Sequence, residues 1–142
     1  MAYNYSRSLI LPFTQVVSRV RENLEDQGFN IINTIDLKRN LKDELKIDFR
    51  NYQILTTCHT LLSYKAISLE PHIGELLPCN VVIQEHENGT VEVSAMNPLE
   101  TLDKNMITMS LELVAMELSN HLRTAIDSLQ TRDKATSSFS YQ

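Results

Sequence analysis

The sequence predicts a single α+β domain with about five strands, several helices and a long C-terminal helix. Short runs of β-branched and aromatic residues alternate with stretches in which apolar residues recur every three or four positions, so strands and helices interleave. Asn88-Gly89 joins two of the apolar runs, and the last long periodic stretch covers residues 102–129. A length of 142 residues suits one domain with one core.

The first part of the chain alternates strand, helix and strand. Residues 5–11 have the composition of a strand, which Pro12 closes. The stretch that follows, through Gln27, has apolar residues at helical spacing: Phe13, Val16, Val17, Val20 and Leu24. Gly28 then ends the helix as a left-handed cap, and residues 29–35 form a second, β-branched strand.

A short amphipathic helix and a third strand come next. Asp36 is placed to cap this helix at its N-terminus. The apolar face of the helix carries Leu37, Leu41 and Leu45. Residues 51–58 follow as a strand and residues 60–70 as a third helix, which Pro71 ends.

Residues 79–96 hold the clearest local pattern, two strands joined by Asn88-Gly89. That dipeptide is typical of a two-residue type I′ turn. Such a turn would place Glu85 opposite Glu92, and like charges that face each other across strands are unfavourable. We therefore expect this end of the hairpin either to be solvated or to contain a bulge that shifts the register.

The long C-terminal helix carries two apolar stripes. The first is expected to face the sheet and contains Leu111, Val114, Ala115, Leu118, Leu122, Ile126 and Leu129. The second contains Met106, Met109, Leu113 and Met116. Three interpretations stay open for the second stripe: packing between the sheet and a neighbouring helix, a dimer contact, or a ligand pocket lined by methionines. Residues 1–130 form the predicted domain, and residues 131–142 are expected to be a disordered tail.

Composition excludes several classes of function. The net charge is −5 and no basic stripe is present, so neither nucleic acid nor an anionic membrane surface is an expected partner. No apolar run approaches the ~20 residues that span a bilayer, and the start of the chain lacks a signal-peptide core. The protein is therefore expected in the cytoplasm, with Cys58 and Cys79 as free thiols or a reversible pair. There is no GxGxxG or Walker loop, and no cofactor is expected.

Three stretches, in this order and at these spacings, resemble a bacterial and archaeal family. They are "IDLKRNLKDELKIDFRNYQILTTC", "GELLPCNVVIQE" and "VSAMNP". Together they look like domain of unknown function 302 (DUF302), over residues 13–98. The resemblance implies a two-layer fold with helices on one face of a mostly antiparallel sheet, and a homodimer; it implies no activity. Cys58 and the "LPCN" of residues 77–80 match the family, whereas His59-Thr60 stands where the family usually has Asn-Pro.

The two cysteines form the candidate site. Cys58 ends a strand just before a helix N-terminus, where the helix dipole and free N–H groups favour a thiolate, and a protonated His59 would act in the same direction. Cys79 begins the next strand, and Asn80 follows it as a polar neighbour. If the two strands are antiparallel neighbours, as the resemblance favours, both thiols lie at one end of the sheet. In a parallel crossover they would lie ~20 Å apart.

Four interpretations of the cysteines stay open: core packing, a redox or nucleophilic thiol site, a ligand pocket walled by the thiols, and a metal site. The metal site would draw on Cys58, His59, His72 and Cys79. Their spacing fits no zinc pattern, so no metal is expected.

Two functions from different classes follow. In the first, the protein is a small homodimer with a thiol-lined cleft that binds a small molecule or a sulfur species. The candidate residues are Cys58 as reactive thiol, His59 as its proton partner, Cys79 as second thiol and Asn80 as ligand contact, with Met106, Met109, Leu113 and Met116 at the dimer interface. The alternative is a non-catalytic interaction module with inert cysteines, acting through its acidic C-terminal half and the tail that carries Phe139 and Tyr141. Whether the protein is an enzyme stays open.

Overall fold

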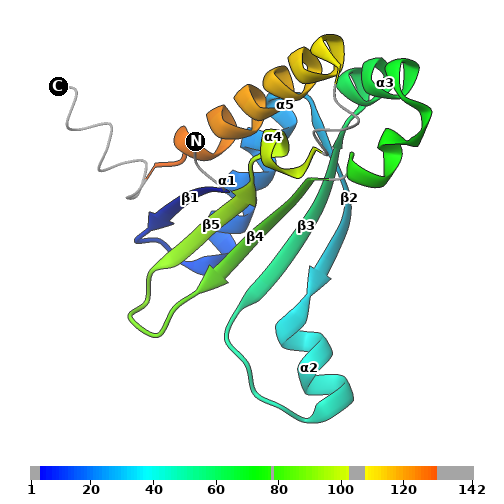
Figure 1. Ribbon diagram of the computed structural model, residues 1–142. Coiled ribbons are helices and arrows are strands. Elements are labelled where there is room, and N and C mark those ends of the chain that lie inside the picture. Colours follow the sequence, from blue (N-terminus) through cyan, green and yellow to red (C-terminus); the bar gives the residue numbers. More distant parts are fainter. Residues whose placement is uncertain (1–3, 78, 103–107, 131–142) are drawn as a thin grey trace, which may run out of the picture.

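The computed structural model describes residues 4–77, 79–102 and 108–130 (Figure 1). In chain order the elements are β1 (Asn4–Leu9), α1 (Phe13–Asp26), β2 (Phe29–Asp36), α2 (Leu37–Leu45), β3 (Tyr52–His59), α3 (Thr60–Leu69), the 3₁₀ helix η1 (Pro71–Leu76), β4 (Cys79–Glu85), β5 (Val91–Met96), α4 (Pro98–Thr101) and α5 (Met109–Asp127). The five strands form one antiparallel sheet in the order β1-β5-β4-β3-β2, which confirms the predicted α+β class. The predicted tail, residues 131–142, lies outside the described residues.

Helices α1 and α5 lie on the same face of the sheet, which makes the fold two-layered (Figure 1). Their apolar stripes meet the inward side chains of the central strands in the main core. Several of these side chains are at most 1% exposed, among them Val16, Leu24, Leu55, Ile83 and Leu122. Burial of each aliphatic side chain of this kind stabilises the fold by ~1.5–3 kcal/mol. The later part of the first stripe, Leu118, Leu122, Ile126 and Leu129, therefore faces the sheet as its spacing predicts, whereas Leu111 packs in a second cluster.

A second, smaller group of buried residues, which we name the satellite cluster, lies at the end of the sheet where β3 runs into α3. Its buried members are Ala66, Ile73 and Leu111. It packs α3, η1 and α4 against the first turns of α5. In Figure 1, α3 lies beyond the end of the sheet where β2 begins and β3 ends, next to the yellow start of α5.

Helix α2 stands apart from both clusters, at the opposite end of β3 (Figure 1). Asp36 caps it as predicted, since its Oδ1 accepts the N–H of Arg39 at 3.2 Å. Lys46 ends it in the left-handed region, with φ 58°. None of the nine residues of α2 is buried, and Leu45 is 62% exposed. The amphipathic pattern thus predicts the helix correctly, but its apolar face adds nothing to the core.

The β4–β5 hairpin has a different turn from the one predicted. A type I′ turn needs positive φ at both central residues. Gly89 has φ 87°, but Asn88 does not take a positive φ. This combination fits a three-residue loop closed by a bulge. Because the loop is one residue longer, Glu92 faces Gln84 rather than Glu85. The shifted register removes the like-charge contact that the shorter turn would have created.

The last long helix does not begin at residue 102 as predicted. Leu102 is extended, with φ −77° and ψ 133°, and ends α4. The Oγ1 of Thr108 then accepts the N–H of Leu111 at 3.1 Å and caps α5. Periodicity alone does not reveal the break, because apolar residues continue at helical spacing across two separate caps. Neither α5 nor any other helix in the described ranges is long and apolar enough to cross a membrane.

A buried polar network fastens α5 to the sheet. Ser119 is 4% exposed and donates from its Oγ to Oδ1 of Asn97 at 3.1 Å. The hydroxyl of Tyr5, on β1, hydrogen-bonds to the same Ser119 oxygen. Asn97, 1% exposed, also accepts the N–H of Leu99 at 3.1 Å and so caps α4. Buried polar groups need such partners, and here one network positions β1, α4 and α5 together.

Candidate functional site

The two cysteines lie at the same end of the sheet, on neighbouring strands. β3 and β4 are antiparallel, and Thr57 stands directly opposite Cys79. The hydroxyl of Thr57 donates to the carbonyl oxygen of Cys79 at 3.0 Å. Both Cys58 and Cys79 are free thiols. The strand arrangement is therefore the one that would allow the thiols to meet.

The side chains of the two cysteines nevertheless point to opposite faces of the sheet. Cys79 shares the face of Thr57, which is fully buried, and packs against the main core. Cys58 is the next residue after Thr57, and successive strand residues alternate between faces. Its side chain therefore points to the face that α1 and α5 leave uncovered, where its Sγ lies 3.0 Å from the Oγ of Ser63.

The surroundings of Cys79 suppress its reactivity. Burial, and to a smaller extent the nearby Cys58, raises the pKa of the Cys79 thiol to about 11. Because the thiolate is the nucleophile, a thiol with this pKa is almost entirely in its unreactive form near neutral pH. Cys58 is half-buried, and its hydrogen-bonding partner Ser63 belongs to α3.

His59 caps α3 and is engaged at both ring nitrogens. Its Nδ1 accepts the N–H of Leu62 at 3.3 Å, and its Nε2 lies 3.0 Å from the carbonyl oxygen of Gln27. A carbonyl only accepts, so Nε2 carries the proton and the ring is the neutral Nε2–H tautomer. The ring is buried, with 8% of the residue exposed, and this burial lowers the pKa of His59. The histidine thus has a structural role on the covered face, whereas Cys58 points to the other face.

Gln27, Gly28 and His121 lie against His59, and we name these four residues the histidine cluster. His121 of α5 stacks on His59 with ring centroids 5.1 Å apart, and its Nδ1 lies 2.9 Å from Oε1 of Gln27. Gly28 has φ 94°, and a Cβ at this position would lie 2.6 Å from Nε2 of His59. The predicted cap is confirmed, and the close approach gives a second reason for glycine there. The cluster joins the end of α1 to β3 and α5.

Asn80 lies on the same uncovered face as Cys58. It is exposed, and its Oδ1 accepts the hydroxyl of Thr56 at 3.0 Å. On the other side of β3, Asn30 stands opposite Cys58 and donates to Oγ1 of Thr60 at 2.8 Å. Amide and hydroxyl groups therefore surround Cys58 on this face.

The structure thus divides the four predicted site residues into two pairs. Cys58 and Asn80 lie on the uncovered face, and His59 and Cys79 lie on the covered face. Only the first pair is placed to meet a ligand at the surface of the sheet. Within the described ranges, no group of three or more His, Cys, Asp and Glu side chains is arranged to hold a metal ion.

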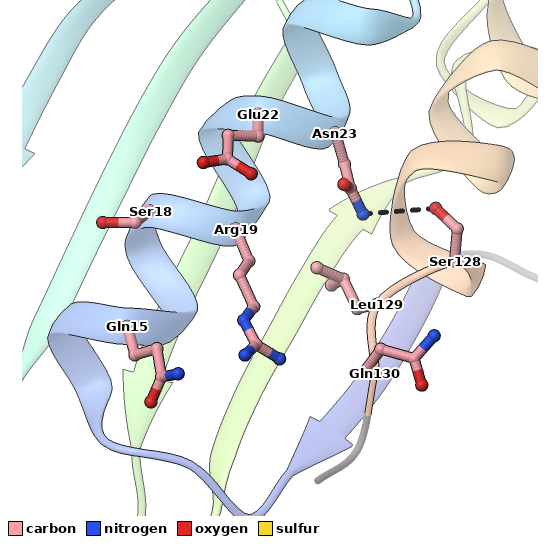
Figure 2. A pocket seen from close by; sticks show the side chains of 8 residues that line it. All are labelled: Gln15, Ser18, Arg19, Glu22, Asn23, Ser128, Leu129 and Gln130. Atoms are coloured by element: carbon pink, nitrogen blue, oxygen red, sulfur yellow. Dashed lines mark hydrogen bonds between the residues drawn. The ribbon is translucent and has the colours of Figure 1, made fainter. Parts of the chain in front are cut away.

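A polar cavity of ≈ 450 Å³ lies between α1 and the end of α5 (Figure 2). It is lined by Gln15, Ser18, Arg19, Glu22, Asn23, Ser128, Leu129 and Gln130. The amide of Asn23 donates to the carbonyl of Ala125 at 3.1 Å and to Oγ of Ser128 at 3.2 Å. Arg7 of β1 donates to the carbonyl of Leu129 at 2.7 Å. These bonds satisfy carbonyl groups at the end of α5, so we interpret the cavity as the junction that holds the helix end in place.

Exposed apolar side chains gather where α3 lies beside α5. We define the α3–α5 surface as Leu61, Tyr64, Leu69, Met109, Leu113 and Met116. Met109 is 81% exposed, Tyr64 72% and Leu113 57%. Tyr64, Leu69 and Leu113 line a shallow groove between the two helices. Neighbouring exposed apolar residues, such as the three that line this groove, mark interaction sites more often than single ones do.

The α3–α5 surface contains three of the four residues of the second stripe. Met109, Leu113 and Met116 are exposed, so they do not pack between the sheet and a neighbouring helix. Met106 lies outside the described residues. The part contributed by α3 was not predicted. The sequence feature that could have predicted this part is the apolar composition of α3 on more than one side. The helix buries Leu62 and Ala66 and exposes other large apolar side chains on the opposite side.

Comparisons with known proteins place the chain in a family. Residues 5–129 match the family model described as "Domain of unknown function DUF302". The chain is also similar to the crystal structure of an uncharacterized conserved protein DUF302 from Bacillus stearothermophilus, with a TM-score of 0.79 and 22% identity over 89% of this chain and 98% of that chain. At this identity the likeness shows a shared fold. No curated protein matches the chain.

Proposed function

Because the chain belongs to the family described as Domain of unknown function DUF302, which has no assigned activity, we propose a function from its exposed surfaces. The protein is a non-catalytic interaction module that forms a homodimer through the α3–α5 surface. The observation that carries this proposal is the exposure of Met109, Tyr64 and Leu113. Burial of a large apolar side chain contributes ~1.5–3 kcal/mol, so covering this surface would favour association.

The charges around the α3–α5 surface suit a contact with a second copy of the chain. Lys65 lines the groove, and the exposed Glu112 and Glu117 lie on either side of Leu113 along α5. In a two-fold contact the same patch meets itself, and residues away from the axis face different residues of the other copy. Lys65 of one copy can then face a carboxylate of the other. Such charge complementarity determines the orientation of the two copies more than the affinity between them.

Sedimentation equilibrium of the full chain tests the proposal. Leu113→Glu places a charge inside the surface and is expected to give a monomer at concentrations where the unsubstituted protein is a dimer. Leu45→Glu is the matched control, because Leu45 is 62% exposed on α2 whereas Leu113 is 57% exposed on α5. The control should remain dimeric. A monomeric unsubstituted protein, or equal weakening by both substitutions, would contradict the proposal.

We propose as a second candidate function that the uncovered face of the sheet binds a small molecule or a sulfur species beside Cys58 and Asn80. The observation in its favour is the shared face of these two residues, with the polar side chains of Asn30 and Thr56 next to them. In this form of the hypothesis Cys58 is the reactive thiol. A cytoplasmic location, which we also propose, would keep it reduced.

Alkylation rates of the native protein, followed separately for each cysteine by mass spectrometry across a pH series, test this second function. Cys58 is expected to react in the folded state, whereas Cys79 should react only after unfolding, because burial holds its pKa at about 11. Ser63→Ala should change the rate of Cys58 alone, since Ser63 Oγ is 3.0 Å from its Sγ. If Cys58 proves inert until the protein unfolds, the second function is wrong.

A further inference from the structure

His59 ends β3 and caps α3, so it connects the sheet to one helix of the α3–α5 surface. Its Nδ1 accepts the N–H of Leu62 at 3.3 Å, and its Nε2–H donates to the carbonyl oxygen of Gln27 at 3.0 Å. One ring nitrogen therefore has to accept a hydrogen bond while the other donates one. Only the neutral ring does both, since the doubly protonated ring has no acceptor nitrogen. The cap of α3 thus depends on the charge of a single side chain.

Protonation of His59 would remove this cap and set two donors against each other. The proton would be added at Nδ1, which lies 3.3 Å from the amide nitrogen of Leu62. That amide lies in the first turn of α3, where N–H groups have no partner within the helix. Helix α3 has ten residues, and so short a helix depends on its ends and on its packing. Asparagine, a commoner capping residue, lacks this dependence because its amide does not titrate.

The neighbours of His59 hold its ring in place. The backbone of Gly28 lies so close that a Cβ there would be 2.6 Å from Nε2. His121 stacks on the ring with centroids 5.1 Å apart, and Phe29 meets it edge-on with centroids 5.2 Å apart. Because the ring is held on these sides, the repulsion between the two donors is relieved by movement of the first turn of α3.

Two titratable side chains of α5 act on His59 within the described part of the chain, His121 and Glu117. A charge on His121 disfavours a proton on His59, whereas Glu117 favours it. The end of α1 contributes the uncharged backbone of Gln27, and β2 contributes the apolar Phe29. Burial has the largest effect and lowers the pKa of His59. The neutral ring is therefore the form present at neutral pH, and the cap is lost only in acid.

The first two turns of α3 carry part of the α3–α5 surface. Leu61 is 58% exposed and Tyr64 is 72% exposed. Both side chains belong to the end of α3 that His59 caps, so they move with it. We propose that His59 is a proton-sensitive cap: its protonation opens the first turn of α3, displaces Leu61 and Tyr64 and weakens self-association. This proposal rests on the proposed homodimer and adds the regulation of its contact by pH.

Sedimentation equilibrium across a pH series tests the proposal, with NMR of the isotope-labelled imidazole to follow the protonation of His59. The dissociation constant of the dimer should rise by about fivefold or more as His59 takes up its proton, the factor that corresponds to the loss of one cap. His59→Asn keeps a cap that does not titrate, so its dissociation constant should stay constant over the same pH range. His121→Gln should respond like the unsubstituted protein. A response that persists unchanged in His59→Asn, or a ring that stays neutral until the protein unfolds, would overturn the proposal.

Amide hydrogen exchange separates failure of this proposal from failure of the proposed homodimer. Protection of Leu62 and Ser63 should fall as His59 is protonated, in the unsubstituted protein and in Leu113→Glu alike, while protection of Val81 in β4 should not change. Falling protection in a chain that is monomeric at neutral pH would show a proton-sensitive cap, but the homodimer and its regulation would be wrong. Unchanged protection at Leu62 while His59 takes up its proton would overturn the cap and leave the homodimer standing.

Discussion

The C-terminal half of α5 lies in the main core, whereas its N-terminal half borders a small apolar space between α3, α4 and α5 on one side and carries exposed apolar residues on the other. Leu122 and Ile126 are at most 1% exposed, but Met109 is 81% and Leu113 57% exposed. One helix therefore serves two regions with different packing. The difference teaches that buried packing in this fold is concentrated over the sheet, while the exposed apolar side chains of α5 lie next to the satellite cluster at its end.

Truncating one leucine in the main core and one in the satellite cluster tests the difference in packing most directly. Leu122→Ala is expected to lower the free energy of unfolding by an amount in the upper part of the ~2–5 kcal/mol range, because its site is fully packed. Leu111→Ala should fall in the lower part of that range, since Leu111 already borders empty space. Urea denaturation of both variants measures the difference. A larger loss for Leu111→Ala would contradict the contrast between the regions.

Two glycines test the histidine cluster that joins the regions. Gly28 and Gly89 have similar positive φ values, 94° and 87°, so alanine is strained at either. A Cβ at Gly28 would also lie 2.6 Å from His59 Nε2, whereas one at Gly89 would meet nothing within 4 Å. Backbone strain of this kind amounts to ~1–3 kcal/mol. In thermal unfolding, Gly28→Ala should lose more stability than Gly89→Ala, and equal losses would mean that His59 moves aside freely.

A cap substitution should have a smaller and local effect. Thr108 accepts the N–H of Leu111 at 3.1 Å at the start of α5. Removal of such a cap by Thr108→Ala is expected to lower stability by ~1 kcal/mol. Hydrogen exchange should accelerate at Leu111 and Glu112 and leave the amides of Val81 and Ile83, in the central strand β4, unchanged. Faster exchange in β4 as well would show that the two regions unfold as one unit.

The pH dependence of stability should separate His59 from the rest of the cluster. Burial lowers the pKa of His59 below its ordinary value of 6.5, so the unfolded chain binds the proton more readily than the folded chain. The contribution of neutral His59 to the free energy of unfolding is therefore complete above pH 6.5. It is lost as the pH falls towards the pKa of His59 in the folded state. Urea denaturation at a series of pH values should show this loss.

His59→Asn provides the control for that series. Asparagine can still cap α3 but does not titrate, so the variant should show a flatter pH dependence whatever its absolute stability. A slope identical to that of the unsubstituted protein would assign the effect to a group other than His59.

The elements with strong periodicity could be predicted from the sequence. The sheet-facing stripe of α5 and the cap of α2 are both found where the pattern places them, because amphipathic spacing and capping are local properties. The two-residue turn was predicted wrongly, whereas the alternative of a bulge that shifts the register is confirmed, since Asn88-Gly89 is compatible with more than one loop length. The choice between lengths depends on which residues of β4 and β5 pair.

The candidate site was harder to predict because it depends on register and on distant packing. The sequence places Cys58 and Cys79 near each other, but only the pairing of Thr57 with Cys79 shows that the two thiols point to opposite faces. Likewise, the small apolar space between α3, α4 and α5 is lined by Ala66 and Ala115, which are far apart in the chain. No local pattern carries that information.

Val114 of α5 lies between the inside and the outside of the region around the satellite cluster. It lines the small apolar space between α3, α4 and α5, and it also lines the outer groove between α3 and α5. A second chain seated in the groove would therefore touch a side chain that also borders the empty space. Any energetic coupling between self-association and packing in the satellite cluster must be reciprocal. A substitution that fills the space and tightens self-association by some factor would itself be stabilised by self-association by the same factor.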